Sequence, residues 1–330
     1  MSDALVDGFG RVHTDLRVSL TDRCNLRCSY CMPPEGLDWL PAPEVLTDDE
    51  LVRVLGIAVG ELGITQVRLT GGEPLLRRGL VDLVRRISAL QPTPELSMTT
   101  NGIGLARIVE DLAAAGLRRV NVSLDTLQRS TFVALARRDR IDDVLAGIDA
   151  ARAVGLSPVK VNTVLMRGVN DHEALGLLRY CMDHGLELRF IEQMPLDAQH
   201  GWDRGVMVTA DEIFERLTAA HTLTPVEERG SSPAEEFLVD GGPATVGVIA
   251  SVSRPFCGNC DRVRLTADGQ VRNCLFAREE SDLRAALRSG ADDEEIARRI
   301  RVSIAGKRAG HGIDDPTFLQ PDRPMSAIGG

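Results

Sequence analysis

Up to about residue 194 the chain alternates between short β-prone runs and longer segments whose apolar residues recur at helical spacing. In the segment 80–90, for example, apolar residues fall three and four positions apart and so form one stripe along a helix. The β-prone runs span 16–20, 66–70, 96–100, 119–124, 159–165 and 187–191, and the helical stripes span 51–62, 80–90, 105–117, 144–154 and 175–182. Four stripes end at a glycine, which readily adopts the left-handed conformation that closes a helix, namely Gly63, Gly116, Gly155 and Gly185.

A strand followed by a helix, repeated about six times, predicts a parallel sheet with right-handed crossovers. A full TIM barrel has about eight such units. We therefore predict an α/β fold, a partial (βα)6 TIM-type barrel, with an open doubly wound sheet as the alternative. In either fold, ligands bind at the carboxyl ends of the strands.

The alternation stops beyond residue 194. The segment 231–234 has loop composition, 263–271 predicts two strands around the Asp268-Gly269 turn, and 282–302 is charged and helical. We therefore predict two regions, a barrel at 1–230 and a C-terminal extension at 231–330.

Composition limits the classes of function. The formal net charge of -10 disfavours a general nucleic-acid binder, so an anionic ligand would need cations concentrated at one site. The first residues carry acid and no apolar run, and no stretch is long enough to span a membrane, which predicts a cytoplasmic protein without a membrane partner.

Six of the seven cysteines form two groups of three. Cys24, Cys28 and Cys31 form CxxxCxxC directly after the first predicted strand, and three thiolates can hold three irons of a 4Fe-4S cube while one iron stays open. Zinc or a purely structural role is the alternative, although zinc commonly needs a fourth ligand such as histidine.

The second group consists of Cys257 and Cys260, in CxxC, and Cys274 beyond the predicted hairpin. The hairpin turn should bring Cys274 back toward the other two, again giving three ligands. Structural zinc is a stronger alternative here. Cys181 stands alone on a predicted helix, where we interpret it as a small buried apolar residue.

The first triad, with Tyr30 before its last cysteine, resembles that of the radical S-adenosylmethionine (SAM) superfamily. In that superfamily SAM chelates the open iron, and one electron from the cluster cleaves it to methionine and a 5′-deoxyadenosyl radical. The motif Gly71-Gly72-Glu73-Pro74, after the second strand, resembles the segment that meets the SAM amino group by backbone and carboxylate. Taken alone, it could be an ordinary turn between strand and helix.

The sequence RPFCGNCDRVRLT at 254–266, followed by NCLF at 273–276, is similar to the second cluster segment of the GTP 3′,8-cyclase family. The resemblance covers nearly the whole chain, including 99–102, 121–125, 160–163, 189–195 and the final Gly329-Gly330. It implies two 4Fe-4S clusters with SAM as cofactor, and conversion of GTP to 3′,8-cyclo-7,8-dihydro-GTP, the first step of molybdenum cofactor biosynthesis.

The resemblance also implies roles for individual residues. The cluster ligands would be Cys24, Cys28 and Cys31 for the first cluster and Cys257, Cys260 and Cys274 for the second. SAM would contact Tyr30, Gly72, Ser123 and Met194. GTP would contact Arg17, Arg68, Thr99, Lys160, Arg262, Val263 and Arg264, with Arg17, Arg262 and Arg264 catalytic.

The positions of the basic residues fit such a site. Arg17, Arg68 and Lys160 lie on three different strands, and Arg262 and Arg264 share one face of a fourth, so five cations could converge on a triphosphate. Each also has an ordinary interpretation. Arg17 and Arg68 could pair with Glu73 or Asp125, Arg262 and Arg264 could form a solvated hairpin face, and Lys160 could extend to solvent.

The implied reaction begins with hydrogen abstraction at C3′ of GTP and continues with addition of the ribose radical to C8 of guanine. The family further implies a homodimer, an electron donor and a downstream cyclic pyranopterin monophosphate synthase. Its terminal glycine pair reaches the active site, whereas an ordinary chain end is disordered. The alternatives are a radical SAM maturase of peptides or proteins and a non-catalytic iron–sulfur electron carrier.

Overall fold

The computed structural model describes residues 4–226 and 229–329. These form one sheet of 12 strands in the order β12-β11-β10-β1-β2-β3-β4-β5-β6-β9-β8-β7. The first six strands are β1 (Asp15–Ser19), β2 (Gln66–Thr70), β3 (Glu95–Thr100), β4 (Arg119–Ser123), β5 (Val159–Val164) and β6 (Glu187–Ile191). The others are β7 (Leu223–Pro225), β8 (Glu235–Val239), β9 (Thr245–Ile249), β10 (Arg262–Leu265), β11 (Gln270–Arg272) and β12 (Ser281–Asp282).

The strands β1 to β6 run parallel and in chain order, as predicted for a partial TIM-type barrel. The C-terminal region adds a parallel strand at each side, because β10 pairs with β1 and β9 pairs with β6. The sequence did not predict β9. One sheet thus joins the two predicted regions, and the boundary at 230 remains a prediction.

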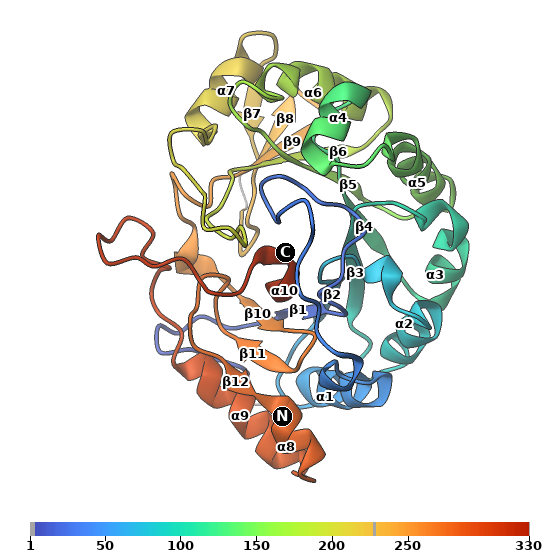
Figure 1. Ribbon diagram of the computed structural model, residues 1–330, viewed down its shortest axis with the longest axis vertical. Helices are drawn as coiled ribbons and strands as arrows, with labels where there is room; N and C mark the ends of the chain where they lie inside the picture. The colour runs from blue at the N-terminus through green and yellow to red at the C-terminus, as the bar shows by residue number, and fades with distance from the viewer. Residues whose placement is uncertain (1–3, 227–228, 330) are drawn as a thin grey trace.

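Helices cover the outer side of the curved sheet (Figure 1). They are α1 (Asp48–Gly60), α2 (Leu80–Ser88), α3 (Val109–Ala115), α4 (Arg129–Ala136), α5 (Ile141–Ala153), α6 (Ala174–Asp183) and α7 (Ala210–Thr218). The C-terminal helices are α8 (Leu283–Arg288), α9 (Asp293–Ala305) and α10 (Met325–Ile328), and α10 enters the central space enclosed by the strands. Among the described residues, no helix is long and apolar enough to cross a membrane.

Two predicted helices are interrupted. The stripe 105–117 begins with a 3-10 turn at Leu105–Arg107, and Ile108, with φ -130° and ψ 0°, separates that turn from α3. The stripe 282–302 becomes α8 and α9, because Gly290 between them has φ 84°. The four predicted helix-closing glycines all have positive φ, as expected, and the hairpin forms between β10 and β11.

The two faces of the barrel strands differ in chemistry. Outward side chains such as Val18, Leu69 and Val122 are fully buried against the helices and form the main hydrophobic core. Inward side chains are polar or charged, for example Arg17 and Asn121. Because side chains alternate along a strand, each strand contributes to the core and to a polar interior at once.

Glu192 connects three elements at the carboxyl end of β6. Its buried carboxylate accepts hydrogen bonds from the backbone N–H groups of Ala210, Val252 and Ser253, the first at 2.8 Å. These contacts tie α7 and the segment after β9 to β6, and so hold that wall of the barrel.

We expect Glu192→Ala to lower the free energy of unfolding by about 3 kcal/mol or more, because it leaves several buried donors without an acceptor. Urea unfolding of the metal-free chain measures this effect. The control is Glu215→Ala, an exposed carboxylate on α7. Equal stability of the two variants would show that Glu192 does not join these elements.

Candidate functional site

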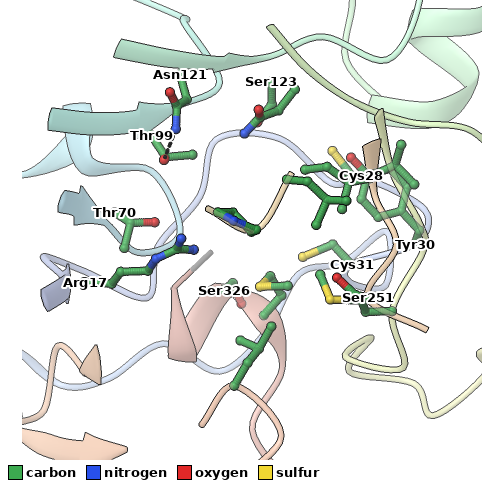
Figure 2. Close-up of a pocket in the computed structure, with 18 of the residues that line it drawn as sticks. Arg17, Cys28, Tyr30, Cys31, Thr70, Thr99, Asn121, Ser123, Ser251 and Ser326 are labelled. Atoms are coloured by element: carbon green, nitrogen blue, oxygen red, sulfur yellow. Dashed lines mark hydrogen bonds between the residues drawn. The ribbon is translucent and has the colours of Figure 1, made fainter. Parts of the chain in front are cut away.

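A cavity of about 330 Å³ occupies the carboxyl end of the barrel. All six cysteines of the two predicted groups line it, together with residues from β1 to β6, β9 and β10 and from α10. Figure 2 shows Arg17 and Thr70 projecting into the cavity from one side, with Cys28, Tyr30 and Cys31 across it. The structure therefore brings the two cysteine groups together although more than 200 residues separate them in sequence.

The first cysteine loop follows β1 and rests on α4. The N–H groups of Arg27 and Ser29 donate to the carbonyls of Ala136 and Leu135 at 3.0 and 2.9 Å. Within the loop, the N–H of Cys31 donates to the carbonyl of Cys28 at 2.9 Å. Backbone contacts therefore fix the loop without using the thiols.

Burial raises the pKa of all three thiols in this loop. The pKa of Cys31 rises to about 12, with the neighbouring Cys24 as a second cause. Cys28 is shifted well above its ordinary value by burial, Asp125 and the other two thiols. Three thiols that repel one another as thiolates suit a cationic centre, since metal binding displaces their protons.

The two glycines after β2 approach the cysteine loop at its backbone. A Cβ at Gly71, where φ is 132°, would lie 2.3 Å from the carbonyl oxygen of Thr21, and one at Gly72 would lie 2.3 Å from that of Arg23. The N–H of Gly72 donates to Thr21 at 2.8 Å. Glycine is required here because any side chain would separate the two loops.

The position of the Glu73 carboxylate differs from the expected one, in which it would meet the SAM amino group. Its carboxylate is completely buried and accepts from the hydroxyl of Thr100 and the N–H of Asn101, both at 2.6 Å, and from the N–H of Leu75 at 3.0 Å. It does not line the cavity. The backbone of this motif can meet a ligand, whereas the carboxylate instead fastens the loop after β2 to the end of β3.

The second cysteine group lies beside two cations. Cys257 begins a 3-10 turn at Cys257–Asn259, Cys260 follows this turn directly, and Cys274 follows β11. Burial raises the pKa of Cys257. Burial also acts to raise that of Cys260, but the charges of Arg262 and Lys307 outweigh it and lower its pKa to about 7.

The geometry of the thiols also bears on the zinc alternative. A zinc ion requires all its thiolates at about 2.3 Å from one point, whereas the irons of a cube hold their thiolates further apart. Within 4–226 and 229–329, no three cysteine, histidine, aspartate or glutamate side chains gather closely enough for a single ion.

Buried arginines form the opposite wall of the cavity. Arg17 and Arg264 are buried. Burial, followed by other arginines, lowers the pKa of Arg68 to about 9 and that of Arg264 well below its ordinary value. The acid beside Arg17 is Asp15, at 3.7 Å, and not Glu73 or Asp125 as suggested by the sequence. Among the described residues, the guanidinium groups of this wall outnumber the carboxylates that pair with them, so the wall is positive.

Arg189 joins this wall, although the sequence prediction omitted it as a site residue. It lies on β6, lines the cavity and pairs with Glu236 at 2.5 Å. Among the described residues, the Nε atoms of Arg17 and Arg189 have no hydrogen-bond acceptor although they are buried. The alternation of charged and apolar residues in β6 could have identified Arg189, because it places this side chain on the inner face with Ile191.

Two predicted GTP residues are placed differently. Lys160 does not line the cavity, because its Nζ atom pairs with Glu187 inside the barrel. The side chain of Val263 faces outward, where it packs with Leu16 and Leu5, so only its backbone could meet a ligand. Alternation along β10 is the reason, since Arg262 and Arg264 both point inward.

The remaining predicted residues line the cavity. They are Tyr30, Arg68, Gly72, Thr99, Ser123 and Met194. Tyr30 donates its hydroxyl to Asp125 at 2.7 Å, and burial raises the pKa of Asp125 to about 6. Asn121, which also lines the cavity, donates to Thr99 at 3.4 Å (Figure 2).

The end of the chain lies inside the barrel. The hydroxyl of Ser19 donates to the carbonyl of Ile328 at 2.8 Å, and Arg264 donates to that of Gly329. A Cβ at Gly329 would lie 2.3 Å from the Ser19 hydroxyl, so only glycine fits. Gly329 therefore reaches the cavity wall, while Gly330 lies outside the described residues.

A parallel partial barrel with a three-cysteine loop after its first strand defines a radical SAM protein. The model of the Radical SAM superfamily matches residues 18–181, and that of Molybdenum Cofactor Synthesis C matches residues 186–313. The chain is 67% identical over 328 residues to a GTP 3′,8-cyclase of Streptomyces coelicolor, covering 99% of this chain and 96% of that protein. It is 59% identical to one of Mycolicibacterium smegmatis, over 99% of this chain and 92% of that protein. The chain belongs to the GTP 3′,8-cyclase family.

Solved structures support the fold alone. The Streptococcus suis protein SuiB bound to S-adenosylmethionine superposes with a TM-score of 0.59 at 13% identity, covering 94% of this chain and 76% of that one. SuiB bound to its precursor peptide SuiA gives the same score at 14% identity, over 90% and 68% of the two chains. At this level of identity, the likeness shows a shared fold.

Glu73 gives a prediction about pH. Burial raises its pKa to about 7 from the ordinary 4.5, more than its three hydrogen bonds lower it. Because the unfolded chain loses this proton first, the fold is destabilised by about 3 kcal/mol as pH rises from about 4.5 to about 7. We expect Glu73→Gln to gain stability relative to the wild type across this interval.

Urea unfolding of the metal-free chains at several pH values measures the difference. The control is Glu110→Gln, which changes an exposed carboxylate on α3. A wild-type-minus-Glu73→Gln difference that stays constant with pH would contradict the assignment.

Proposed function

We propose that this chain converts GTP to (8S)-3′,8-cyclo-7,8-dihydroguanosine 5′-triphosphate, with the buried arginine wall holding the triphosphate. The observation that carries the proposal is the combination, in one cavity, of two cysteine triads and several buried guanidinium groups with too few carboxylates to neutralise them. A triphosphate supplies both the negative charge and the acceptors that this wall lacks.

The cofactors fit the residues present. Cys24, Cys28 and Cys31 would hold the first 4Fe-4S cluster, and Cys257, Cys260 and Cys274 the second. When bound, the clusters and SAM supply the one-electron chemistry that starts and completes the cyclisation. Tyr30, Gly72, Ser123 and Met194 lie in the part of the cavity proposed for SAM.

The protein's own side chains would bind and orient GTP and enclose the reaction site. Arg17, Arg68 and Arg264 would bind the phosphates. Arg189, which the structure adds to the cavity lining, would bind them as well. Arg262, which lies beside Cys260, would act close to the guanine end. Holding the ribose of GTP beside the cleaved bond of SAM brings the reacting atoms together, and the buried walls exclude water and other hydrogen donors.

Lys160 and Val263 remain proposed GTP contacts, but with smaller roles than the sequence predicted. Lys160 could reach a phosphate if its contact with Glu187 opened, and Val263 could contribute through its backbone. Thr99 remains a proposed contact for GTP, because its hydroxyl lines the cavity.

We also propose a cytoplasmic homodimer that takes electrons from a separate donor and passes its product to a cyclic pyranopterin monophosphate synthase, without nucleic-acid or membrane partners. All seven cysteines are free, which suits a reducing compartment, and the net charge is -10. Consumption of SAM that depends on GTP, with release of 5′-deoxyadenosine, separates this function from a peptide maturase and from an electron carrier.

Substitution of Arg17 tests the role of the arginine wall. Removing one charged hydrogen-bonding group should lower kcat/KM for GTP by about 10- to 100-fold. Arg119→Ala serves as the control, because Arg119 pairs with Glu95 at 2.7 Å and does not line the cavity. If Arg17→Ala formed product as efficiently as Arg119→Ala, the triphosphate assignment would be wrong.

Iron content tests the two ligand sets. The reconstituted wild-type chain should hold about eight irons, and either Cys24→Ala or Cys257→Ala should lose about four. Cys181→Ala should keep all of them, since Cys181 is buried on α6 away from the cavity. Anaerobic iron and sulfide analysis with Mössbauer spectra gives the numbers, and zinc in place of iron would refute both sets.

A further inference from the structure

Lysine is rare in this chain. Of the 38 lysines and arginines, only Lys160 and Lys307 are lysines, and both are buried. The two residue types are not interchangeable, because an ammonium is a compact point charge with three donors whereas a guanidinium is a wide planar fork. Lys160 pairs with carboxylates inside the barrel. Lys307, two residues after α9, has different surroundings.

Lys307 is directed at the second cysteine motif. Its Nζ atom donates to the carbonyl of Arg262 at 2.9 Å and to that of Cys260 at 3.3 Å, and it lies 3.2 Å from the sulfur of Cys260. Among the described residues, no carboxylate lies within ion-pairing distance of this group. The thiolate of Cys260 is therefore the anion that this ammonium contacts.

His13 orients the ammonium from the other side. The Nε2 atom of His13 donates to Asp7 at 3.1 Å, which leaves Nδ1, at 3.5 Å from Lys307, as an acceptor. Asp7 also accepts from Arg11, and Arg11 donates to the carbonyl of Cys257 at 2.7 Å. The N-terminal loop thus supports both Lys307 and the CxxC turn.

We propose that Lys307, oriented by His13, tunes the second iron–sulfur cluster by donating a charged hydrogen bond to the Cys260 thiolate and so stabilising the reduced, more negative state. Net charge and hydrogen bonds to sulfur are among the factors that set cluster potentials. The inference rests on the proposed assignment of Cys257, Cys260 and Cys274 as ligands.

The test measures the reduction potential of the second cluster alone. In a Cys24→Ala/Cys28→Ala/Cys31→Ala background, Lys307→Met and Lys307→Gln are titrated anaerobically and followed by EPR. We expect the reduction potential of both variants to become more negative. At a fixed solution potential, the ratio of reduced to oxidised cluster should fall at least tenfold, which corresponds to about 59 mV for one electron. Lys307→Arg should shift less, and Arg119→Met, which removes a cation that does not line the cavity, should not shift.

Each outcome is decisive. Neutral variants that keep the cluster and the wild-type potential would overturn the proposal. If the neutral variants lose iron, the proposal is supported when Lys307→Arg regains both the iron content and the reduction potential of the second cluster. Loss of iron in all three, with normal thermal unfolding of the metal-free chains, overturns it. A background protein without any cluster would instead refute the ligand assignment, and with it this inference.

Discussion

The alternation of apolar and charged side chains along the barrel strands allows one sheet to form both the hydrophobic core and the reaction chamber. In most parallel sheets both faces are apolar, because helices cover both. Here the outer face of β1 to β6 packs against helices, and the inner face carries groups such as Arg17, Arg68 and Asn121. The fold therefore buries charged groups whose favourable partners are ligands. Burying them costs folding free energy, which the hydrophobic core on the outer face must offset.

The two cysteine groups lie in different surroundings within this chamber. The first lies among carboxyl and hydroxyl groups, where burial raises the pKa of its thiols. The second lies beside Arg262 and Lys307, whose charges lower the pKa of Cys260. The two cysteine groups thus differ in the charges beside them, although burial raises the pKa of Cys257 in the second group as it does for the thiols of the first.

Both ends of the chain complete the site. The N-terminal loop, through Asp7, His13 and Arg11, supports the second cysteine turn, and Gly329 lies at the carboxyl ends of β1 and β2, against Ser19 and Thr70. The central cavity is therefore assembled from segments that are remote in sequence. A truncation at either end would therefore remove contacts to the site, and one that removed Leu5 would also remove a residue of the main hydrophobic core.

The sequence by itself determined the six parallel strands, the helices between the early strands, the hairpin at Asp268-Gly269 and both cysteine triads. These features depend on local periodicity, turn chemistry and ligand spacing, which are visible in a single chain. Only the tertiary structure decided which cations face the cavity. Arg189 enters it, Lys160 is held by Glu187, the Val263 side chain turns outward and the Glu73 carboxylate is used between loops. It also decided that β9 and β10 extend opposite sides of the sheet and that Lys307 lies against Cys260. The side of the sheet that a residue faces follows from alternation along its strand, but the partner that it meets there depends on contacts between distant segments, which the local pattern of residues does not encode.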